Sequence, residues 1–172
     1  MRFKAGDWGI DPTRIGIMGF SAGGHLCSTA VTMFDDKFEQ ETNDPIDQVS
    51  CRPDFGILCY PVIAMGQPHC HQGSVRNLLG ANPSRELLDR NNTARRVTRK
   101  TPPIFLVHSA DDRAVPLRNG TDFAAACADK GVPVSCHIYA QGGHGYGLGR
   151  SGDSKNWPDR LEDWLRHNKW MK

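Results

Sequence analysis

Short apolar runs alternate with amphipathic stretches along most of this chain. The apolar runs are residues 14–20, 55–63, 104–108 and 134–139, and each has the length and composition of a strand that is buried on both faces. Helical composition or periodicity is found in residues 22–34, 117–130 and 157–169, with shorter pieces in 75–79 and 83–90. This alternation predicts an α/β fold in which a mostly parallel sheet is covered by helices on both faces.

The segments between these elements are expected to be loops. Residues 35–51 are polar, residues 64–74 are rich in Gly, Pro and His, and residues 142–149 contain many glycines. Residues 1–8 resemble the tail of a helix that Gly9 ends.

The length of 172 residues suits one domain, which we expect to span residues 1–172. The chain is 38% hydrophobic and 23% charged, and its net charge of +2 gives no reason to expect a nucleic acid or a membrane as a partner. No apolar run approaches the ~20 residues that span a bilayer, and the N-terminus lacks the apolar core of a signal peptide. These features predict a cytoplasmic location if Met1 is the true start.

The cysteines give no sign of a metal centre. All six are spread along the chain without C-x-x-C spacing. Cys70 lies between His69 and His71, but neighbouring side chains point in opposite directions and no second ligand pair is evident. We therefore expect no metal and no cofactor. Cys51 and Cys70 lie in expected loops and could pair only in an oxidising compartment.

The segment Gly19-Phe20-Ser21-Ala22-Gly23 lies between the first apolar strand and the helix that follows it. In this G-x-S-x-G pattern, small neighbours let the chain turn sharply, so that the serine hydroxyl stands at the end of the strand above a helix N-terminus. Ser21 is therefore the candidate nucleophile. The backbone N–H of Ala22 is the candidate donor to an oxyanion.

A serine hydroxyl needs a base, and His144 in a glycine-rich loop after the fourth strand is the best candidate. Asp111 and Asp112 follow the third strand, and either could orient the imidazole. All these positions come after strands, at the edge where a parallel sheet gathers its reactive groups. His25 is expected to pack or to form a hydrogen bond near the substrate, and His108 is expected to anchor the turn after the third strand.

The chain resembles the C-terminal half of an α/β-hydrolase of the esterase/lipase group that includes acetylxylan esterase-like proteins. The residues that carry the resemblance are Trp8 to Leu26 around the elbow, Arg52-Pro53-Asp54-Phe55, Tyr60-Pro61-Val62-Ile63, Pro102 to His108, and Gly142-Gly143-His144-Gly145-Tyr146-Gly147. The segment His108 to Pro116 is similar to the family's H-G-x-x-D-x-x-V-P. It aligns Asp112 with the catalytic acid, which leaves Asp111 to cap the turn.

The resemblance implies a serine esterase that acts on small acyl esters, such as acetyl groups on carbohydrate, without a cofactor. Ser21, His144 and Asp112 would form the triad. The loops 64–74 and 145–153 would shape the acyl and alcohol pockets, with Tyr146 at the entrance as a substrate contact.

The sequence departs from the family at its start. The family has several strands before the elbow and an H-G-G-G-type loop that supplies a second oxyanion donor, and neither is found in this sequence. The implied fold is a truncated α/β-hydrolase domain with about four strands. Its open sheet edge favours a homo-oligomer, unless the sequence is a fragment. Two alternatives stay open at this point: a peptidase with the same triad, and an inactive domain that serves as an oligomerising module.

Overall fold

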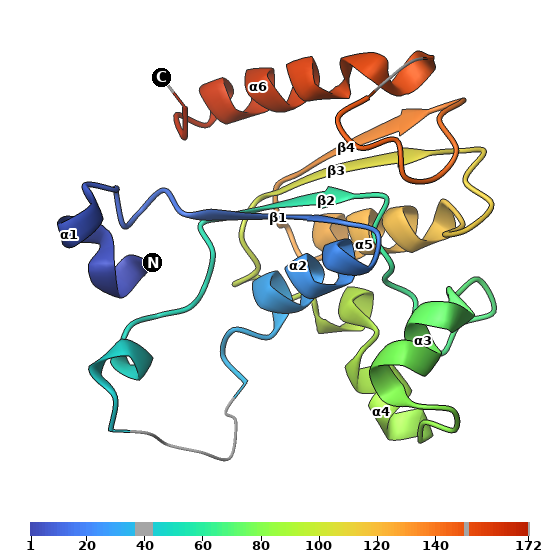
Figure 1. Ribbon diagram of the computed structural model, residues 1–172, viewed down its shortest axis with the longest axis horizontal. Helices are drawn as coiled ribbons and strands as arrows, with labels where there is room; N and C mark the ends of the chain where they lie inside the picture. Colours follow the sequence, from blue (N-terminus) through green and yellow to red (C-terminus); the bar gives the residue numbers. More distant parts are fainter. Residues whose placement is uncertain (37–42, 150–151, 172) are drawn as a thin grey trace.

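The computed structural model describes residues 1–36, 43–149 and 152–171. Its central feature is one sheet of four parallel strands in the order β1-β2-β3-β4. The strands are β1 (Gly16–Phe20), β2 (Phe55–Cys59), β3 (Ile104–Ser109) and β4 (Val134–Tyr139). All four run in the same direction, so their carboxyl ends meet at one edge, on the right in Figure 1.

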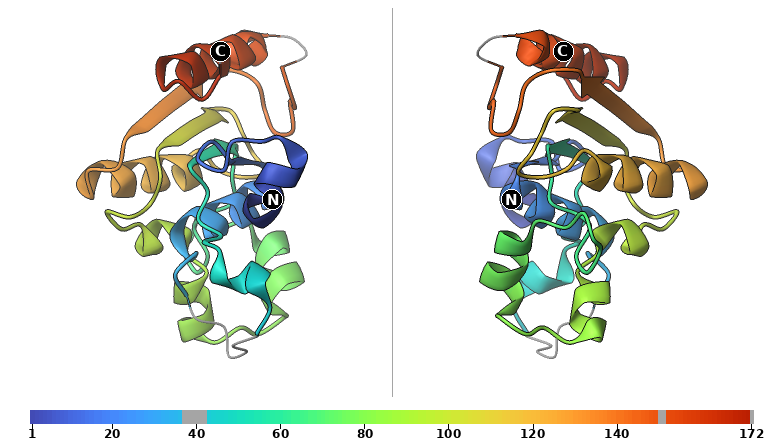
Figure 2. Two further views of the ribbon diagram at one scale, coloured as in Figure 1. Left: turned by 90° about the vertical axis from the view of Figure 1, so that its left-hand side faces the viewer. Right: turned by 90° about the vertical axis from the view of Figure 1, so that its right-hand side faces the viewer.

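Helices cover both faces of the sheet (Figure 1). One face carries α2 (Ala22–Thr32) and α5 (Arg118–Asp129), and the other carries α6 (Trp157–His167). The helices α3 (Gln72–Leu79) and α4 (Arg85–Arg90) lie on the α2 side, toward the carboxyl ends of the strands. The turned views in Figure 2 show the same three layers, with α6 alone on its side. Short helical segments complete the described structure: η1 (Arg2–Lys4), α1 (Ala5–Trp8), η2 (Pro45–Gln48), η3 (Thr93–Arg96) and η4 (Asp153–Asn156).

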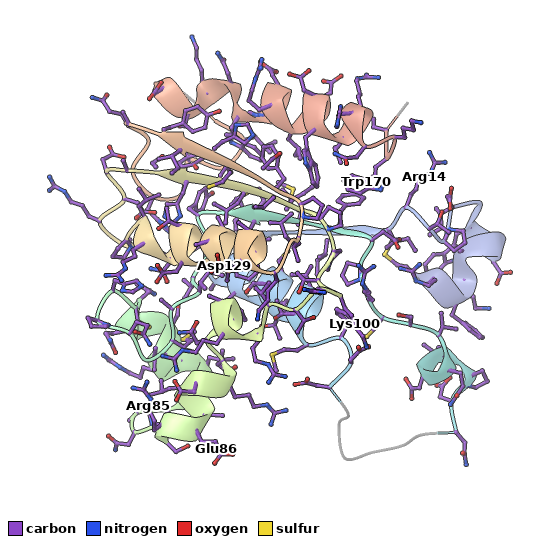
Figure 3. All side chains as sticks on the ribbon, turned by 180° about the vertical axis from the view of Figure 1, so that it is seen from behind. Arg14, Arg85, Glu86, Lys100, Asp129 and Trp170 are labelled. Atoms are coloured by element: carbon purple, nitrogen blue, oxygen red, sulfur yellow. The ribbon has the colours of Figure 1, made fainter. Side chains whose placement is uncertain are left out.

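The two sides of the sheet have different cores. Aliphatic side chains and cysteines fill the space beneath α2 and α5, where Leu58, Leu106 and Phe123 are fully buried. Aromatic rings fill the space beneath α6, and the Phe55 and Trp170 rings stack with their centroids 4.5 Å apart. Figure 3 shows Trp170 between the end of the chain and the sheet. The aromatic layer lets a single helix cover this face, because each large ring buries much apolar area.

The predicted fold class is confirmed, and each predicted strand and helix is found: the strand at residues 134–139 has the predicted bounds, and the others have shifted ends. The strand predicted for residues 55–63 ends at Cys59, because Tyr60 has a φ of +37° and Pro61 follows it. The helix predicted from residue 75 begins at Gln72, because the His71 side chain accepts a hydrogen bond from the Ser74 N–H. The segment η3 was not predicted. Among the described residues, no helix is both long enough and apolar enough to cross a bilayer.

Candidate active site

Ser21 stands at the turn between β1 and α2, with a φ of +53° and a ψ of −116°. This region is strained for a residue with a side chain, and the surroundings hold it in place. The Ser21 N–H donates to the Cys59 carbonyl at 3.0 Å, and the Val62 N–H donates to the Ser21 carbonyl at 3.1 Å. Gly19 allows the sharp turn, since a Cβ there would collide with the Gly23 backbone.

The structure brings the side chains of Ser21, His144 and Asp112 together. His144 Nε2 lies 2.8 Å from Ser21 Oγ, and His144 Nδ1 lies 2.7 Å from Asp112 Oδ2. A carboxylate oxygen only accepts, so Nδ1 carries the proton and Nε2 is free to accept the serine hydroxyl proton. The imidazole is one-quarter exposed, whereas the carboxylate side chain is fully buried. Ser21 Oγ, the His144 imidazole and the Asp112 carboxylate thus form one continuous set of contacts.

The Asp112 carboxylate accepts hydrogen bonds at both oxygens. Its Oδ1 accepts from the Ala114 and Val115 N–H groups at 2.9 Å each, while Oδ2 faces His144 and, at 3.4 Å, His108 Nε2. Burial alone raises the pKa of Asp112, but the hydrogen bonds from His108, His144 and Val115 outweigh it and hold the pKa below its ordinary value. The carboxylate therefore stays charged beside the imidazole.

The expectation that Asp111 caps its own turn is wrong. That turn is capped by Asp112 Oδ1, through the Ala114 and Val115 N–H groups. Asp111 Oδ1 instead accepts from the Gly142 N–H at 3.0 Å and the Gly143 N–H at 2.8 Å. Adjacent side chains point in different directions, so one aspartate faces His144 and the other faces the loop that carries it.

Three further residues were singled out from the sequence: Ala22, His25 and Tyr146. Ala22 begins α2, so its N–H has no acceptor within the helix and is available to an oxyanion. His25 is buried, and its Nδ1 lies 3.1 Å from the Val62 carbonyl oxygen, as expected for a packing role. Tyr146 is also buried, with its ring edge-on to Tyr60 at a centroid distance of 4.6 Å. A role for Tyr146 as a substrate contact stays a prediction.

Tyr60 was not singled out as a site residue on sequence grounds. It lies at the end of β2, its ring is edge-on to the His144 imidazole at 5.0 Å, and its hydroxyl accepts from the Gly147 N–H at 3.0 Å. The Tyr60-Pro61 pair directly after a buried strand was the available signal. A tyrosine at positive φ, however, is not something that sequence indicates.

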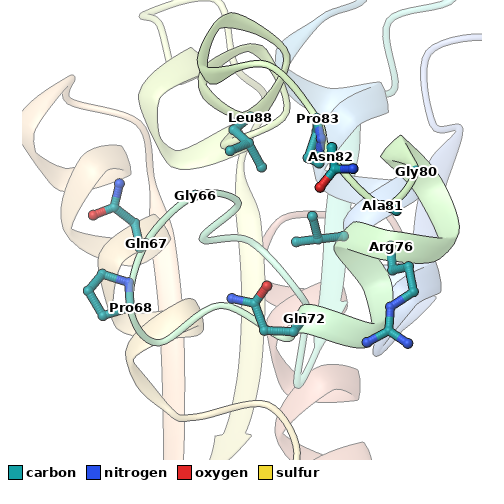
Figure 4. Close-up of a pocket in the computed structure, with 11 residues that line it drawn as sticks. Gly66, Gln67, Pro68, Gln72, Arg76, Gly80, Ala81, Asn82, Pro83 and Leu88 are labelled. Atoms are coloured by element: carbon teal, nitrogen blue, oxygen red, sulfur yellow. The ribbon is translucent and has the colours of Figure 1, made fainter.

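A hollow of about 650 Å³ opens between the loop after β2, α3 and the start of α4. Figure 4 shows Gln72 and Asn82 reaching toward this space from opposite sides. Gln67 and Arg76 also line it, and Leu88 and Pro83 add apolar surface. Within the described part of the chain, the four polar side chains have no hydrogen-bond or ionic partner, so their donors and acceptors are available.

Comparison with known proteins identifies the family of this chain. The model of the BD-FAE family matches residues 1–127. The chain belongs to the BD-FAE family. It is 39% identical to endo-1,4-beta-xylanase B of Butyrivibrio fibrisolvens over 84% of this chain and 22% of that protein. It is 37% identical to the acetylxylan esterase of Xylanibacter ruminicola over 87% of this chain and 29% of that protein.

A solved structure is similar along nearly the whole BD-FAE chain. The acetyl ester-xyloside bifunctional hydrolase of Caldicellulosiruptor lactoaceticus shares 42% identity with a TM-score of 0.93, over 99% of this chain and 62% of that one. The present chain thus spans less than a third of the curated relatives that it matches, and under two thirds of this structure. The resemblance to acetylxylan esterase-like α/β-hydrolases is confirmed.

Proposed function

We propose that this BD-FAE family member is a carboxylic ester hydrolase that uses Ser21, His144 and Asp112 as a catalytic triad. The observation that carries the proposal is the continuous set of contacts from Ser21 Oγ through His144 to Asp112, at 2.8 and 2.7 Å. Two distances in this range, with the proton on Nδ1, are what general-base activation of a serine requires. The names of the acetylxylan esterase and the acetyl ester-xyloside hydrolase among its relatives support an acyl ester as the substrate.

In the first half of the reaction, Ser21 Oγ attacks the carbonyl carbon of the ester while His144 Nε2 takes the hydroxyl proton. Asp112 stabilises the imidazolium cation that forms. The Ala22 N–H binds the negative charge that develops on the carbonyl oxygen. The tetrahedral intermediate then collapses: the bond from carbon to the alcohol oxygen breaks, and His144 returns the proton to the leaving alcohol.

In the second half, water clears the acyl-enzyme. His144 Nε2 takes a proton from the water as its oxygen attacks the acyl carbon, and the bond to Ser21 Oγ breaks. The proton returns to Ser21, the carboxylic acid leaves, and the site is restored. In both halves the protons move only between Ser21, His144, the leaving alcohol and water.

The polar hollow is the proposed site for the alcohol part of the substrate, for which we favour a carbohydrate. The Val62 N–H donates a hydrogen bond to the Ser21 carbonyl, and Gly66, four residues later, lines the hollow. Four residues of extended chain span at most about 14 Å, so Gly66 lies within that distance of Val62. Amide side chains both donate and accept, as sugar hydroxyls do. Gln72 and Asn82 could therefore bind a sugar ring whose acyl group lies at Ser21.

The decisive test compares wild type with Ser21→Ala in labelling by a fluorophosphonate and in turnover of p-nitrophenyl acetate. We expect labelling and turnover in wild type, and neither in the variant. Equal, slow hydrolysis by both proteins would contradict the proposal and favour an inactive domain. Acetylated xylo-oligosaccharides then test the carbohydrate, and an aminoacyl-p-nitroanilide tests the alternative of a peptidase. Turnover of the anilide without turnover of any ester would favour that alternative.

A further inference from the structure

The loop that carries His144 donates backbone hydrogen bonds to two side chains. One accepts from N–H groups before the histidine, and the other accepts from an N–H group after it. Before His144, the Gly142 and Gly143 N–H groups donate to Asp111 Oδ1 at 3.0 and 2.8 Å. After it, the Gly147 N–H donates to the Tyr60 hydroxyl at 3.0 Å. These contacts come from the ends of β3 and β2, so rigid strands hold a segment of irregular backbone.

The sequence of this loop explains why it needs such anchors. Gly143, Gly145 and Gly147 all have a positive φ, at +61°, +77° and +57°. Glycines restrict the backbone least, so an unanchored loop of this composition would sample many positions of the imidazole. The productive distance from His144 Nε2 to Ser21 Oγ, 2.8 Å, leaves little room for such motion.

We propose that Asp111 and Tyr60 are positioning residues that fix His144 for proton transfer, without touching the substrate. Asp111 does so with a charged acceptor that holds two successive N–H groups, which is stronger than a neutral hydrogen bond. Tyr60 holds the far side with its hydroxyl and also packs its ring against the imidazole at a centroid distance of 5.0 Å. The inference rests on the proposed function, because it assigns these residues a role in the action of His144.

The carboxylate at position 111 thus has a different role from its neighbour. Asp112 acts on the imidazole directly, through Nδ1, whereas Asp111 acts on the backbone two positions before it. Because Asp111 touches no reacting atom, its loss should slow the chemical step and leave substrate binding unchanged. A displacement of about 1 Å in a catalytic group costs on the order of 10²-fold in rate.

The experiment measures kcat and KM for p-nitrophenyl acetate per active site, where sites are counted by fluorophosphonate labelling at completion. For Asp111→Ala we expect kcat to fall by about 10- to 100-fold with KM unchanged. Asp111→Asn keeps an acceptor oxygen of the same shape and should recover most of the rate. Counting active sites separates a loss of positioning from a loss of folded protein, since a variant that only folds less well keeps its full kcat per labelled site.

The chain offers a matched control in Asp44, whose Oδ1 accepts from the Ile46 N–H at 2.8 Å. It is also a carboxylate that holds a backbone N–H, but at the start of η2, outside the loop that carries His144. Asp44→Ala should keep its kcat per site. Tyr60→Phe should lower kcat less than Asp111→Ala, and the double variant should depart from additivity, because both residues hold one loop. Equal kcat per site in Asp111→Ala and wild type would overturn the proposal.

A second measurement separates failure of this proposal from failure of the proposed function. The Nδ1 proton between His144 and Asp112 can be followed by NMR in wild type and in Asp111→Ala. This measurement does not require that either protein hydrolyses a substrate. We expect its signal to broaden or disappear in the variant, because the imidazole is no longer held in one place. Absence of labelling and turnover in wild type would refute the esterase assignment alone. An unchanged Nδ1 signal in the variant would refute the positioning role.

Discussion

His108 and Asp112 are linked through a single imidazole N–H. His108 Nε2 lies 2.9 Å from the Val115 carbonyl oxygen and 3.4 Å from Asp112 Oδ2. Because a carbonyl only accepts, the proton must be on Nε2. His108 is fully buried, so this proton is shared between the end of the turn and the carboxylate that the turn carries. The third strand therefore supplies both the acid and the residue that fixes it.

The pKa of Asp112 makes the stability of the protein depend on pH on the acid side. A carboxylate whose pKa is lowered on folding contributes stability that is fully present above its unfolded pKa of about 3.9 and is lost as the pH falls through the folded value. Urea unfolding from pH 5 to pH 2.5 should therefore show a decreasing free energy of unfolding. Asp112→Asn should reduce that slope.

The exposed Asp11 provides the comparison for this measurement. Hydrogen bonds from the Thr13 side chain and backbone lower the pKa of Asp11 to about 2, so its contribution has the same sign. Asp11 lies in solvent, however, where such contributions are screened. We expect Asp11→Asn to change the slope less than Asp112→Asn does. The reverse order would contradict the hydrogen-bonding account of Asp112.

The substitution Asp112→Asn should also have a large effect on catalysis. In Asp112→Asn, the amide N–H can donate a hydrogen bond to His144 Nδ1. This favours the tautomer with the proton on Nε2, which cannot accept the proton of Ser21. A loss of about 10⁴-fold in kcat is expected for a triad that works in this way. Hydrolysis of p-nitrophenyl acetate measures it. A loss of only a few-fold would show that the carboxylate is not essential.

Much of the site could be predicted from local sequence. The alternation of apolar runs and helices indicated the sheet most clearly at β2 and β3, which are buried throughout and contain few polar residues. The G-x-S-x-G pattern gave Ser21, since the sharp turn has strict requirements for small neighbours. The preference for Asp112 over Asp111 came only from the resemblance to a family, because both residues follow the same strand.

The contacts of Asp111 and Tyr60 could not be predicted in this way. Asp111 and Gly142 are 31 positions apart, so their hydrogen bond depends on how β3 and β4 pair and where the following loops turn. The positive φ of Tyr60 is held by tertiary contacts against its own preference. Both contacts belong to loops, whose conformations are set by the complete fold more than by their own residues.

His25 should make the protein less stable as the pH falls below neutrality. Burial lowers the pKa of His25, and the hydrogen bond to Val62 offsets this only in part. The unfolded chain takes up a proton below about pH 6.5 while the folded protein does not, so stability falls by up to about 1.4 kcal/mol per pH unit. His25→Asn should reduce the slope between pH 7.5 and pH 5.5, as measured by urea unfolding.

The half-buried His137 is the control for this prediction. Its pKa is also lowered, by burial and by Arg160, so His137→Asn should change the slope in the same direction but less, because water reaches its ring. An unchanged slope in His25→Asn would mean that the imidazole is protonated in the folded protein.

The edge strand β1 is the proposed site of self-association. Within the described residues β1 pairs with β2 alone, and Met18 on it is 38% exposed. An open edge of this kind can pair with a second copy, and a lysine on it opposes such pairing. Light scattering after size exclusion should give more than the monomer mass for wild type and the monomer mass for Met18→Lys. Ile138→Lys on the other edge strand, β4, is the control and should leave the mass unchanged. A monomeric wild type would refute the proposal.

Gly19 and Gly23 lie on either side of Ser21 but should respond in opposite ways to alanine. A Cβ at Gly19 would collide with the Gly23 carbonyl group, so Gly19→Ala must displace the elbow. We expect the Gly19→Ala variant to lose fluorophosphonate labelling and to unfold at a lower urea concentration than wild type. A Cβ at Gly23 meets no atom within 4 Å beyond its chain neighbours and its own helix backbone, and Gly23 lies within α2. Gly23→Ala should therefore raise the free energy of unfolding by up to about 1 kcal/mol, because alanine restricts the unfolded chain and favours the helix. Equal destabilisation by both substitutions would show that the elbow needs glycine for conformational freedom at both positions and not for close approach at one.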